Sequence, residues 1–273
     1  MTEKTPFMRS SQWRGLDSSG DSDSFVAYLD RAAVTLREAR EEVIQSLELN
    51  PGCSLLDVGS GAGEFVIEVA GSVEGVRAVG IDRSDAMVAA ATARARDAGV
   101  EVKFVVGDAQ HLDFPDRSFD RVNCSRVLLH LDDARAAVGE MARVLAPGGR
   151  LAIIEPDHDA FMIDSEDRAI AGAVRGHLTA GLRNPDIGRR LRRLLLDAGL
   201  DVMSVSGRAR PVPNLQYANS QFHLFDHLDA AVAAGEVDAR EAAEWRRWVE
   251  AADASKDLFI TPILFHVVAT KPV

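Results

Sequence analysis

The sequence contains little cysteine and no long apolar run. Only two of its 273 residues are cysteine, Cys53 and Cys124, and their spacing fits neither a disulfide framework nor a metal site. No segment approaches the roughly 18 apolar residues of a membrane span, and residues 1–20 lack the apolar core of a signal peptide. These absences predict a cytosolic protein whose two cysteines are small buried side chains with free thiols.

Positive charge is also scarce. The chain has 31 Lys and Arg against 42 Asp and Glu, which gives a formal net charge of −11. A nucleic-acid backbone or an anionic membrane would be repelled by this charge, so neither is expected as the main partner. A chain of this length buries enough apolar surface to fold without disulfides or a structural metal, and we expect one domain with an appended lid.

Strand-like apolar runs alternate with helical patterns over residues 51–155. This alternation is typical of βαβ units and of an α/β fold with a doubly wound parallel sheet. The five expected strands are residues 53–58, 76–81, 102–106, 119–124 and 150–155. Helices are expected at 64–71, 84–98 and 132–145, with Ser84 and Asp132 as N-caps and Pro147-Gly148-Gly149 as a terminator.

The pattern changes after residue 155. We expect a helix at 186–198, strands at 201–206 and 258–269, and helical segments at 215–234 and 236–255. The insertion between the last two strands is longer than a hairpin needs, so residues 159–184 and 209–256 are predicted to form a helical cap. A loose arm of 20 residues and one or two helices, together residues 1–50, are expected to contribute to that cap over the main domain, 51–273.

A glycine-rich turn directly follows the first expected strand. Residues 55–65 read LLDVGSGAGEF, and Gly59, Gly61 and Gly63 would let the backbone turn sharply and a ligand lie against bare main chain. A dinucleotide fingerprint needs a third glycine where this chain has Glu64, whose carboxylate would repel a pyrophosphate. An NAD-dependent oxidoreductase is therefore disfavoured, while a tight turn without a ligand remains an alternative.

Acidic residues follow the second and third expected strands. Asp82 lies 19 residues after Gly63, where a carboxylate can accept hydrogen bonds from both hydroxyls of a ribose. Capping of the next helix is the alternative role for Asp82. Asp108 is positioned to accept a hydrogen bond from an adenine amino group, so the two carboxylates predict an adenosine site.

These motifs, with FDRV at 119–122 and ARVLAPGGRL at 142–151, resemble the class I S-adenosylmethionine-dependent methyltransferases. The resemblance is stronger to the small-molecule branch related to ubiquinone and menaquinone biosynthesis methyltransferases, and it covers residues 55–155. It implies a Rossmann-like, mostly parallel seven-stranded sheet with an antiparallel last strand at 258–269. Residues 51–273 would then be the methyltransferase domain.

The resemblance also implies which residues bind S-adenosylmethionine. The glycines would pass under its methionine portion, a strand-end carboxylate would take the ribose, and the residues after the third strand would take adenine. Met87 would line the adenine face, with a core role as the alternative. In chain order the implied cofactor residues are Asp57, Gly59, Gly61, Gly63, Asp82, Arg83, Met87, Asp108, Ala109 and Ser125.

Histidines after the fourth and fifth strands are the candidate general bases. Methyl transfer from a sulfonium depends on alignment of the acceptor, and a hydroxyl or carbon acceptor usually also needs its proton removed. His130 is the first candidate and His158 the second, with a structural role as the alternative for each. Asp157 is a carboxylate alternative. No His/Cys cluster indicates a metal.

Further polar side chains are candidates for acceptor binding. Arg126 would either anchor an acidic group of the substrate or pair with Asp132 or Asp133. His177, Tyr217, His223 and the aromatic residues of the predicted cap, Phe222, Phe225, Trp245 and Trp248, are candidates for the acceptor pocket, with core or surface roles as alternatives.

The predicted function is transfer of a methyl group from S-adenosylmethionine to an oxygen or carbon atom of a small, fairly apolar acceptor. The first alternative is a protein of the same fold that binds S-adenosylmethionine but performs other chemistry, because a cap can change while the sheet stays the same. The second and weaker alternative is an NAD-dependent oxidoreductase.

Overall fold

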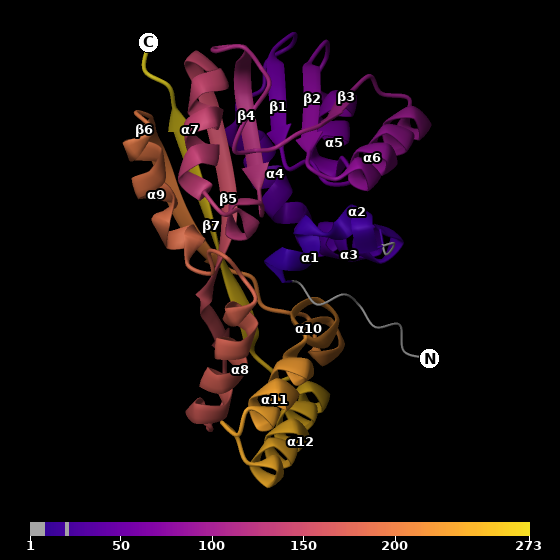
Figure 1. The fold of residues 1–273 in the computed structure, drawn as a ribbon, viewed down its shortest axis with the longest axis vertical. Helices are drawn as coiled ribbons and strands as arrows, with labels where there is room; N and C mark the ends of the chain where they lie inside the picture. Colours follow the sequence, from indigo (N-terminus) through magenta and orange to yellow (C-terminus); the bar gives the residue numbers. More distant parts are fainter. Residues whose placement is uncertain (1–8, 20–21) are drawn as a thin grey trace.

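A seven-stranded sheet forms the centre of the protein, for which a computed structural model describes residues 9–19 and 22–273. The strand order is β3-β2-β1-β4-β5-β7-β6 (Figure 1). Its strands are β1 (Ser54–Val58), β2 (Arg77–Asp82), β3 (Lys103–Val106), β4 (Phe119–Ser125), β5 (Leu145–Ile163), β6 (Asp201–Ala209) and β7 (Ile260–Thr270). The first five strands pair in parallel, and β7 is antiparallel to both β5 and β6. The expected Rossmann-like sheet with an antiparallel last strand is confirmed.

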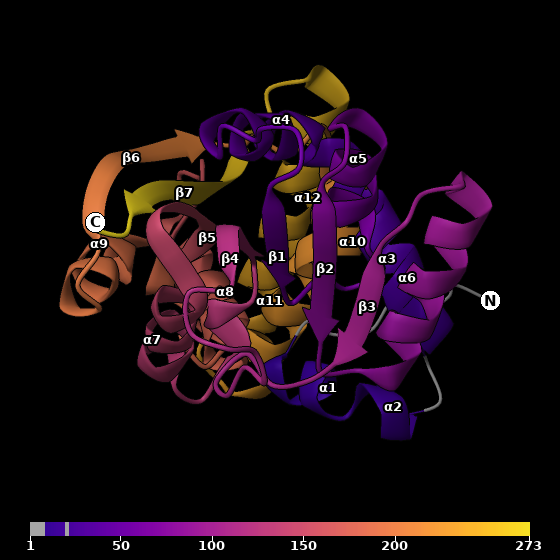
Figure 2. The same ribbon diagram turned by 90° about the horizontal axis from the view of Figure 1, so that it is seen from above.

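Helices cover both faces of the sheet because its central strands are apolar on both sides. Successive strand residues point to opposite faces, and Leu55 accordingly packs in one apolar cluster and Leu56 in another. The cluster around Leu55 contains α4 (Arg37–Ser46) and α5 (Glu64–Ser72). The cluster around Leu56 contains α7 (Ala134–Val144) and α9 (Ile187–Asp197); Figure 2 shows these two layers from above.

Strand β5 is longer than the expected 150–155 and begins as soon as α7 ends. The Pro147-Gly148-Gly149 segment ends the helix but lies within the strand, where Gly148 has φ +74°. Beyond Asp157, β5 leaves the sheet and pairs again with β7 as far as Ile163 opposite Ile260. This ribbon leads to a second lobe with its own apolar cluster, formed by α8 (Arg168–Ala180), α10 (Leu215–Phe222), α11 (Leu224–Ala233) and α12 (Ala239–Ser255) (Figure 1).

The N-terminal segment is more ordered than the loose arm that the sequence predicts. Residues 10–14 and 16–19 form α1 and α2, α3 (Ser22–Thr35) follows, and residues 1–8 and 20–21 lie outside the described part. Leu16 packs in an apolar cluster with Phe25 and Met87. Met87 belongs to α6 (Asp85–Ala98). In the first turn of this helix, the Ala86 N–H donates a hydrogen bond of 3.1 Å to the Asp17 carboxylate. Long-range contacts therefore give structure to a polar segment that has little helical signal of its own.

Two helix starts test the capping predictions. The Ser84 hydroxyl accepts a hydrogen bond from the Met87 N–H at 3.2 Å, which confirms Ser84 as the N-cap of α6. The prediction for Asp132 is wrong, because Asp133 caps α7 and Asp132 instead pairs with Arg183.

The expected helix at 215–234 is also interrupted, by His223 in a left-handed conformation between α10 and α11. Both cysteines are free and buried, as expected. Within residues 9–19 and 22–273, no helix combines the length and apolar character needed to cross a membrane.

Candidate active site

A cavity of about 320 Å³ opens at the carboxyl ends of β1, β2 and β4. Its floor is the glycine-rich turn and the strand ends, and its walls come from α1 to α4, from the loop after β4, and from α8 and α10. In doubly wound sheets this edge is where ligands bind. Of the twelve residues that the sequence predicts for the site, ten line the cavity, and Gly63 and Met87 do not.

The glycine-rich turn presents bare main chain to the cavity. Gly59, Gly61 and Gly63 have φ values of +72°, +51° and +86°, a region that glycine adopts without strain. A Cβ on Gly59 would collide with the Val127 side chain. Gly63 caps α5, and a Cβ there would lie 2.8 Å from the Phe104 ring, so its role is close packing beneath the site.

Asp82 fastens this turn to the end of β2. Its carboxylate accepts a hydrogen bond from the Gly61 N–H at 2.9 Å and another from the Ser84 N–H at 3.0 Å. Burial raises the pKa of Asp82, and the N–H donors oppose this rise. Each carboxylate oxygen has two lone pairs, so the group can still accept further hydrogen bonds from a ligand.

Asp57 connects β1 to β4 beneath the cavity. The side chain is only 3% exposed, and burial raises the pKa of Asp57 to about 7. It accepts a hydrogen bond of 2.6 Å from the Asn123 amide, and Ser125 donates to the other end of that amide at 3.2 Å. Asn123 was missed in the sequence. The feature that could have revealed Asn123 is its polar side chain within an apolar strand, and in the parallel register it lies opposite Asp57.

The remaining predicted cofactor residues lie at the rim or in the core. Asp108 and Arg83 are exposed side chains that line the cavity, and Ala109 beside Asp108 is buried. The Asp108 carboxylate accepts a hydrogen bond from the Gln110 N–H at 2.9 Å. Met87 is buried beneath α2 and α3, so the alternative of a core role holds for this residue.

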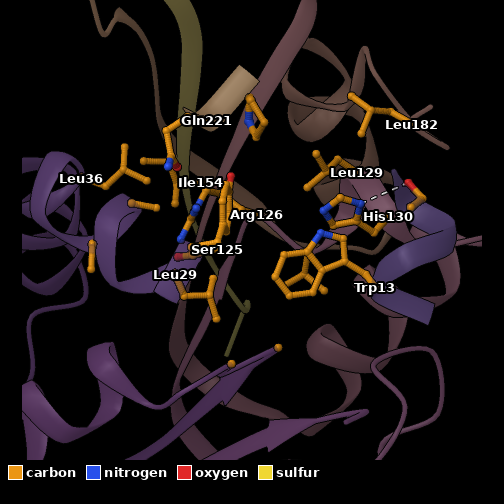
Figure 3. A pocket seen from close by; sticks show the side chains of 18 of the residues that line it. Trp13, Leu29, Leu36, Ser125, Arg126, Leu129, His130, Ile154, Leu182 and Gln221 are labelled. Carbon is orange, nitrogen blue, oxygen red and sulfur yellow. Dashed lines mark hydrogen bonds between the residues drawn. The ribbon is translucent and has the colours of Figure 1, made fainter. Parts of the chain in front are cut away.

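His130 lies in a short 3₁₀ turn after β4, Leu128–His130, and faces the cavity. Its Nδ1 lies 3.1 Å from the Ser10 hydroxyl of α1, and its ring lies 5.6 Å from the Trp13 ring, between centroids (Figure 3). Burial lowers the pKa of His130 to about 3, and the nearby His158 and Arg126 lower it further in the same direction. The imidazole is therefore neutral at pH 7.

His158 lies on β5 beyond the sheet and also lines the cavity. Its buried Nδ1 has no hydrogen-bond partner among the described residues, and burial lowers the pKa of the ring to about 4. The rings of Phe161 and Phe222 each lie 6.4 Å from it, between centroids. Both candidate bases are thus neutral imidazoles that can accept a proton.

The carboxyl groups of Asp157 and Glu155, which precede His158 on β5, have different roles. Asp157 is buried, forms a two-pronged ion pair with Arg189 on α9 and does not line the cavity, so this geometry does not support a role as a base. Glu155, which the sequence did not single out, accepts hydrogen bonds of 2.7 Å from the N–H groups of Val127 and Leu128. Burial raises the pKa of Glu155 to about 8. Glu155 therefore positions the loop that carries His130.

The second lobe supplies the wall opposite the glycine turn. His177 from α8, and Tyr217, Gln221 and Phe222 from α10, line the cavity, as does His223. Trp245 is instead a core residue that donates to the Ser165 hydroxyl at 2.9 Å. Gln221 was missed in the sequence because a single glutamine in a helical pattern carries no functional signal.

Arg126 projects into the cavity from the loop after β4 (Figure 3). The expected pairing with Asp132 or Asp133 does not form, since those carboxylates engage Arg183 and the start of α7. In the part of the chain that the structure describes, its guanidinium makes neither a hydrogen bond nor an ion pair.

Comparison with known proteins shows which family the chain belongs to. The model of the methyltransferase domain matches residues 56–153. An O-methyltransferase, resE of Aspergillus sclerotiorum, is 33% identical over 66% of this chain and 67% of its own length. The chain belongs to the class I S-adenosylmethionine-dependent methyltransferases. This membership sets aside the NAD-dependent alternative and makes S-adenosylmethionine the cofactor.

Two further relatives are similar over part of their own length. The demethylmenaquinone methyltransferase of Thermus thermophilus is 38% identical over 46% of this chain and 58% of its own length. An uncharacterized protein in a transposon of Streptomyces fradiae is 37% identical over 81% of this chain and 65% of its own length. The chain thus spans about 55 to 65% of the lengths of the first relatives that it matches.

Two solved structures are similar in fold. The YcgJ protein of Bacillus subtilis superposes with a TM-score of 0.61 at 21% identity, covering 87% of this methyltransferase and 99% of YcgJ. The [4+2]-cyclase SpnF superposes with a TM-score of 0.56 at 25% identity, covering 86% of this chain and 80% of SpnF.

The residues at the strand ends fit S-adenosylmethionine. Gly59 and Gly61 bring main chain to the cavity, and the buried Ser60 hydroxyl between them has no partner among the described residues. Asp82 and Asp108 offer acceptors at the ends of adjacent strands, as an adenosine requires.

Proposed function

We propose that this methyltransferase transfers the methyl group of S-adenosylmethionine to an oxygen or carbon atom of a small, fairly apolar acceptor. One observation carries the proposal: a single cavity contains both the glycine-rich turn and two neutral histidines. Between them its walls are largely apolar, with Leu29, Leu129 and Leu182 among them (Figure 3). The similarity to demethylmenaquinone and O-methyltransferases is consistent with such acceptors.

The residues of the cavity would bind, orient and deprotonate the acceptor. When bound, the cofactor supplies a methyl group on a sulfonium, whose thioether leaves without an acid. Apolar walls exclude water and fix the approach of the acceptor, on which the rate of a direct displacement depends. His130 or His158 would accept the proton of a hydroxyl or an activated carbon.

The proposal is tested by S-adenosylhomocysteine formation with a panel of phenols, hydroxy acids and enolisable ketones, and by identification of the methylated atom. With an active acceptor, His130→Ala and His158→Ala are then compared at saturating cofactor. Replacement of the true base should lower turnover about a hundredfold or more, with cofactor affinity nearly unchanged. His266→Ala is the matched control, since His266 is a buried histidine outside the cavity that contacts Ser46.

The pH profile of turnover provides a further test of the bases. Because burial lowers the pKa of His130 to about 3 and that of His158 to about 4, both rings stay unprotonated well below the ordinary imidazole range. Turnover should therefore be flat through pH 6.5 and fall only as the pH approaches 4. Wild-type turnover and an unchanged profile in both variants would exclude the two histidines as the base.

A second candidate function is chemistry other than methylation with the cofactor retained. It is favoured by the similarity to SpnF, which is a [4+2]-cyclase. In that case a bound acceptor would be converted while S-adenosylmethionine is neither consumed nor turned into S-adenosylhomocysteine. Mass spectrometry of product and cofactor from one reaction separates the two functions.

We also propose which segments form a cap, where in the cell the enzyme acts and what kind of partner it has. Residues 1–50 and the insertions at 159–184 and 209–256 would act as the cap of the methyltransferase domain, 51–273, because α1, α8 and α10 contribute side chains to the cavity. The proposed setting is the cytosol, with a small molecule as the acceptor, and the net charge of −11 disfavours a nucleic acid or an anionic membrane as a partner. Limited proteolysis with and without S-adenosylhomocysteine should show protection of the cap segments on binding.

A further inference from the structure

Buried polar atoms without partners are concentrated at the cavity. Among the described residues, seven side chains carry a buried nitrogen or oxygen atom that makes no hydrogen bond, and six of these side chains line the cavity. Such atoms are costly unless a ligand or water pairs with them. Three of the six, Trp13, Arg210 and Gln221, present an N–H donor, so part of the cavity is suited to a ligand that accepts hydrogen bonds.

Arg126 adds an unmatched positive charge to these donors. Two other arginines that line the cavity are paired, Arg40 with Glu68 and Arg210 with Glu38 and Glu42, while Arg83 is an exposed side chain at the rim. The Arg126 guanidinium has no such partner in the described part of the chain.

The backbone holds Arg126 in place. Its N–H donates to the Ile154 carbonyl at 2.9 Å, with φ at +59°, and Figure 3 shows the side chain extending into the cavity. These contacts fix the backbone of Arg126, and the positive charge that its side chain brings to the cavity favours an anionic ligand group.

Gln221 lies on the acceptor side of the cavity. It belongs to α10, is only 3% exposed, and its Nε2 is the buried atom without a partner. The Phe222 ring on the same helix lies 6.4 Å from the rings of both Tyr217 and His158, between centroids. This aromatic wall belongs to the second lobe, away from the glycine turn, and it suits an apolar ligand body.

We propose that Arg126 and Gln221 form a carboxylate-binding subsite for the acceptor, which is therefore a small apolar molecule that bears a carboxylate. The proposal rests on the proposed function, because it takes this part of the cavity as the acceptor pocket. A guanidinium and an amide N–H both donate to carboxylate oxygens, and such charge-assisted bonds are strong where water is excluded. The subsite would also fix the direction in which the acceptor enters.

The methionine carboxylate of the cofactor is the other possible source of the same chemistry, since Arg126 directly follows Ser125. The position of Gln221 on α10 favours the acceptor. An experiment with separate cofactor and acceptor arms distinguishes the two sources.

The acceptor arm uses calorimetry on the enzyme saturated with S-adenosylhomocysteine. The probes are para-coumarate and its neutral amide, para-coumaramide, which share an apolar body and differ in charge. We expect the acid to bind about tenfold more tightly or better, the scale of a charge-assisted hydrogen bond. Equal affinities in the wild-type enzyme would overturn the proposal, whatever the variants do.

Variants assign the preference to the two residues. Arg126→Gln should abolish the preference for the acid, Arg126→Lys should retain part of it, and Gln221→Leu should reduce it about threefold or more, because a neutral donor is weaker. All non-glycine residues share the backbone cost at φ +59°, so the Arg126 variants are matched in strain. Arg40→Gln is the control, because Arg40 lines the cavity with its charge already paired. An undiminished preference in folded Arg126→Gln would also overturn the proposal.

The cofactor arm compares S-adenosylhomocysteine with methylthioadenosine, which lacks the methionine carboxylate. If Arg126→Gln weakens binding of the first about tenfold or more but leaves the second unchanged, the carboxylate belongs to the cofactor and the proposal fails. We expect neither affinity to change.

The outcome is separable from that of the proposed function. A preference for the acid that depends on Arg126, with no S-adenosylhomocysteine formed from any acceptor, would support the subsite while contradicting methyl transfer. Methyl transfer to neutral acceptors alone would support the proposed function while contradicting the carboxylate subsite.

Discussion

The two sides of the cavity that we propose for the cofactor and for the acceptor are built in different ways. The cofactor edge is the glycine-rich turn with Asp82, and the acceptor wall is formed by α1, α8, α10 and the loop after β4. At the cofactor edge, the glycine-rich turn and Asp82 lie within about 25 residues of each other, and the Gly61 N–H donates a hydrogen bond to the Asp82 carboxylate. At the acceptor wall, neighbours in space are distant in sequence: Ser10 contacts His130, 120 positions away. The first region is encoded by local motifs and the second by the packing of α1, α8 and α10 on the strand ends.

Gly61→Val should have the largest effect on binding at the cofactor edge. At φ +51° a branched residue is strained, and a Cβ at this position would lie 3.2 Å from Leu29 Cδ1, on the cavity side of the turn. We expect affinity for S-adenosylhomocysteine to fall about a hundredfold or more, measured by calorimetry. Gly99→Val, at φ +69° with open space around it at the end of α6, should lower stability but leave affinity intact. Retained binding in Gly61→Val would contradict this position for the cofactor.

Glu155→Ala tests the link between the two regions. It would leave the N–H groups of Val127 and Leu128 buried without an acceptor, so we expect a loss of about 2–4 kcal/mol in the free energy of unfolding and weaker turnover. Glu155→Gln keeps an acceptor oxygen and should stay within about 1 kcal/mol of the wild type at neutral pH. Urea titration measures both variants, and an equal loss in each would argue against this positioning role.

The stability of the wild type should also depend on pH in a way that the stability of Glu155→Gln does not. Burial raises the folded-state pKa of Glu155 from 4.5 to about 8, so the unfolded chain loses this proton first. Stability from this group is therefore present below pH 4.5 and is lost as the pH rises toward 8. The wild type should lose stability over that window relative to Glu155→Gln, and parallel curves would contradict the raised pKa.

Asp82→Ala should have a smaller effect, confined to the cofactor edge. We propose that the Asp82 carboxylate accepts from the ribose. Its loss, which also removes the acceptor of the Gly61 N–H, should weaken S-adenosylmethionine binding by roughly 1.5–3 kcal/mol. Asp120→Ala is a useful control, because Asp120 binds Ser54 at the opposite end of the strands and should affect stability alone. Unchanged calorimetric affinity in folded Asp82→Ala would remove this residue from the ribose site.

The smallest expected effect is at the acceptor wall. Ser10→Ala removes a hydroxyl that contacts His130 Nδ1 and accepts from the Arg183 N–H, each at 3.1 Å. We expect KM for the acceptor to rise by a factor that corresponds to about 0.5–1.5 kcal/mol, with cofactor affinity unchanged. Ser46→Ala removes the similar contact with His266 outside the cavity and should leave KM unchanged. A fall in cofactor affinity in Ser10→Ala would argue against the division between the two regions.

The sheet, and the residues that lie at the cavity beside its strand ends, could be predicted from the sequence because both depend on local patterns. Buried strands alternate with amphipathic helices, and the residues that follow each strand meet at one edge whatever the details of packing. Gly59, Gly61, Asp82 and Asp108 could be assigned in this way. Met87 could not, because its burial depends on α2 and α3, which approach from a distant part of the chain.

The acceptor wall was less predictable for the same physical reason. Helices α1 and α2 are short polar segments that become ordered only on contact with α6 and the loop after β4. Gln221 and Glu155 carry no motif, and their importance arises from burial, which a pattern of residues does not reveal. His130 and His158 were found because they follow strands, while their neutral state depends on the surrounding walls.

The central claim is that one cavity binds the cofactor at the glycine turn and the acceptor beside the two histidines. A crystal structure with S-adenosylhomocysteine bound tests it most directly. In that structure the ribose should lie on Asp82, the adenine beside Asp108, and the sulfur should face the part of the cavity lined by His130 and His158. A sulfur atom closed off from both histidines, or a ligand bound away from the glycine turn, would contradict it.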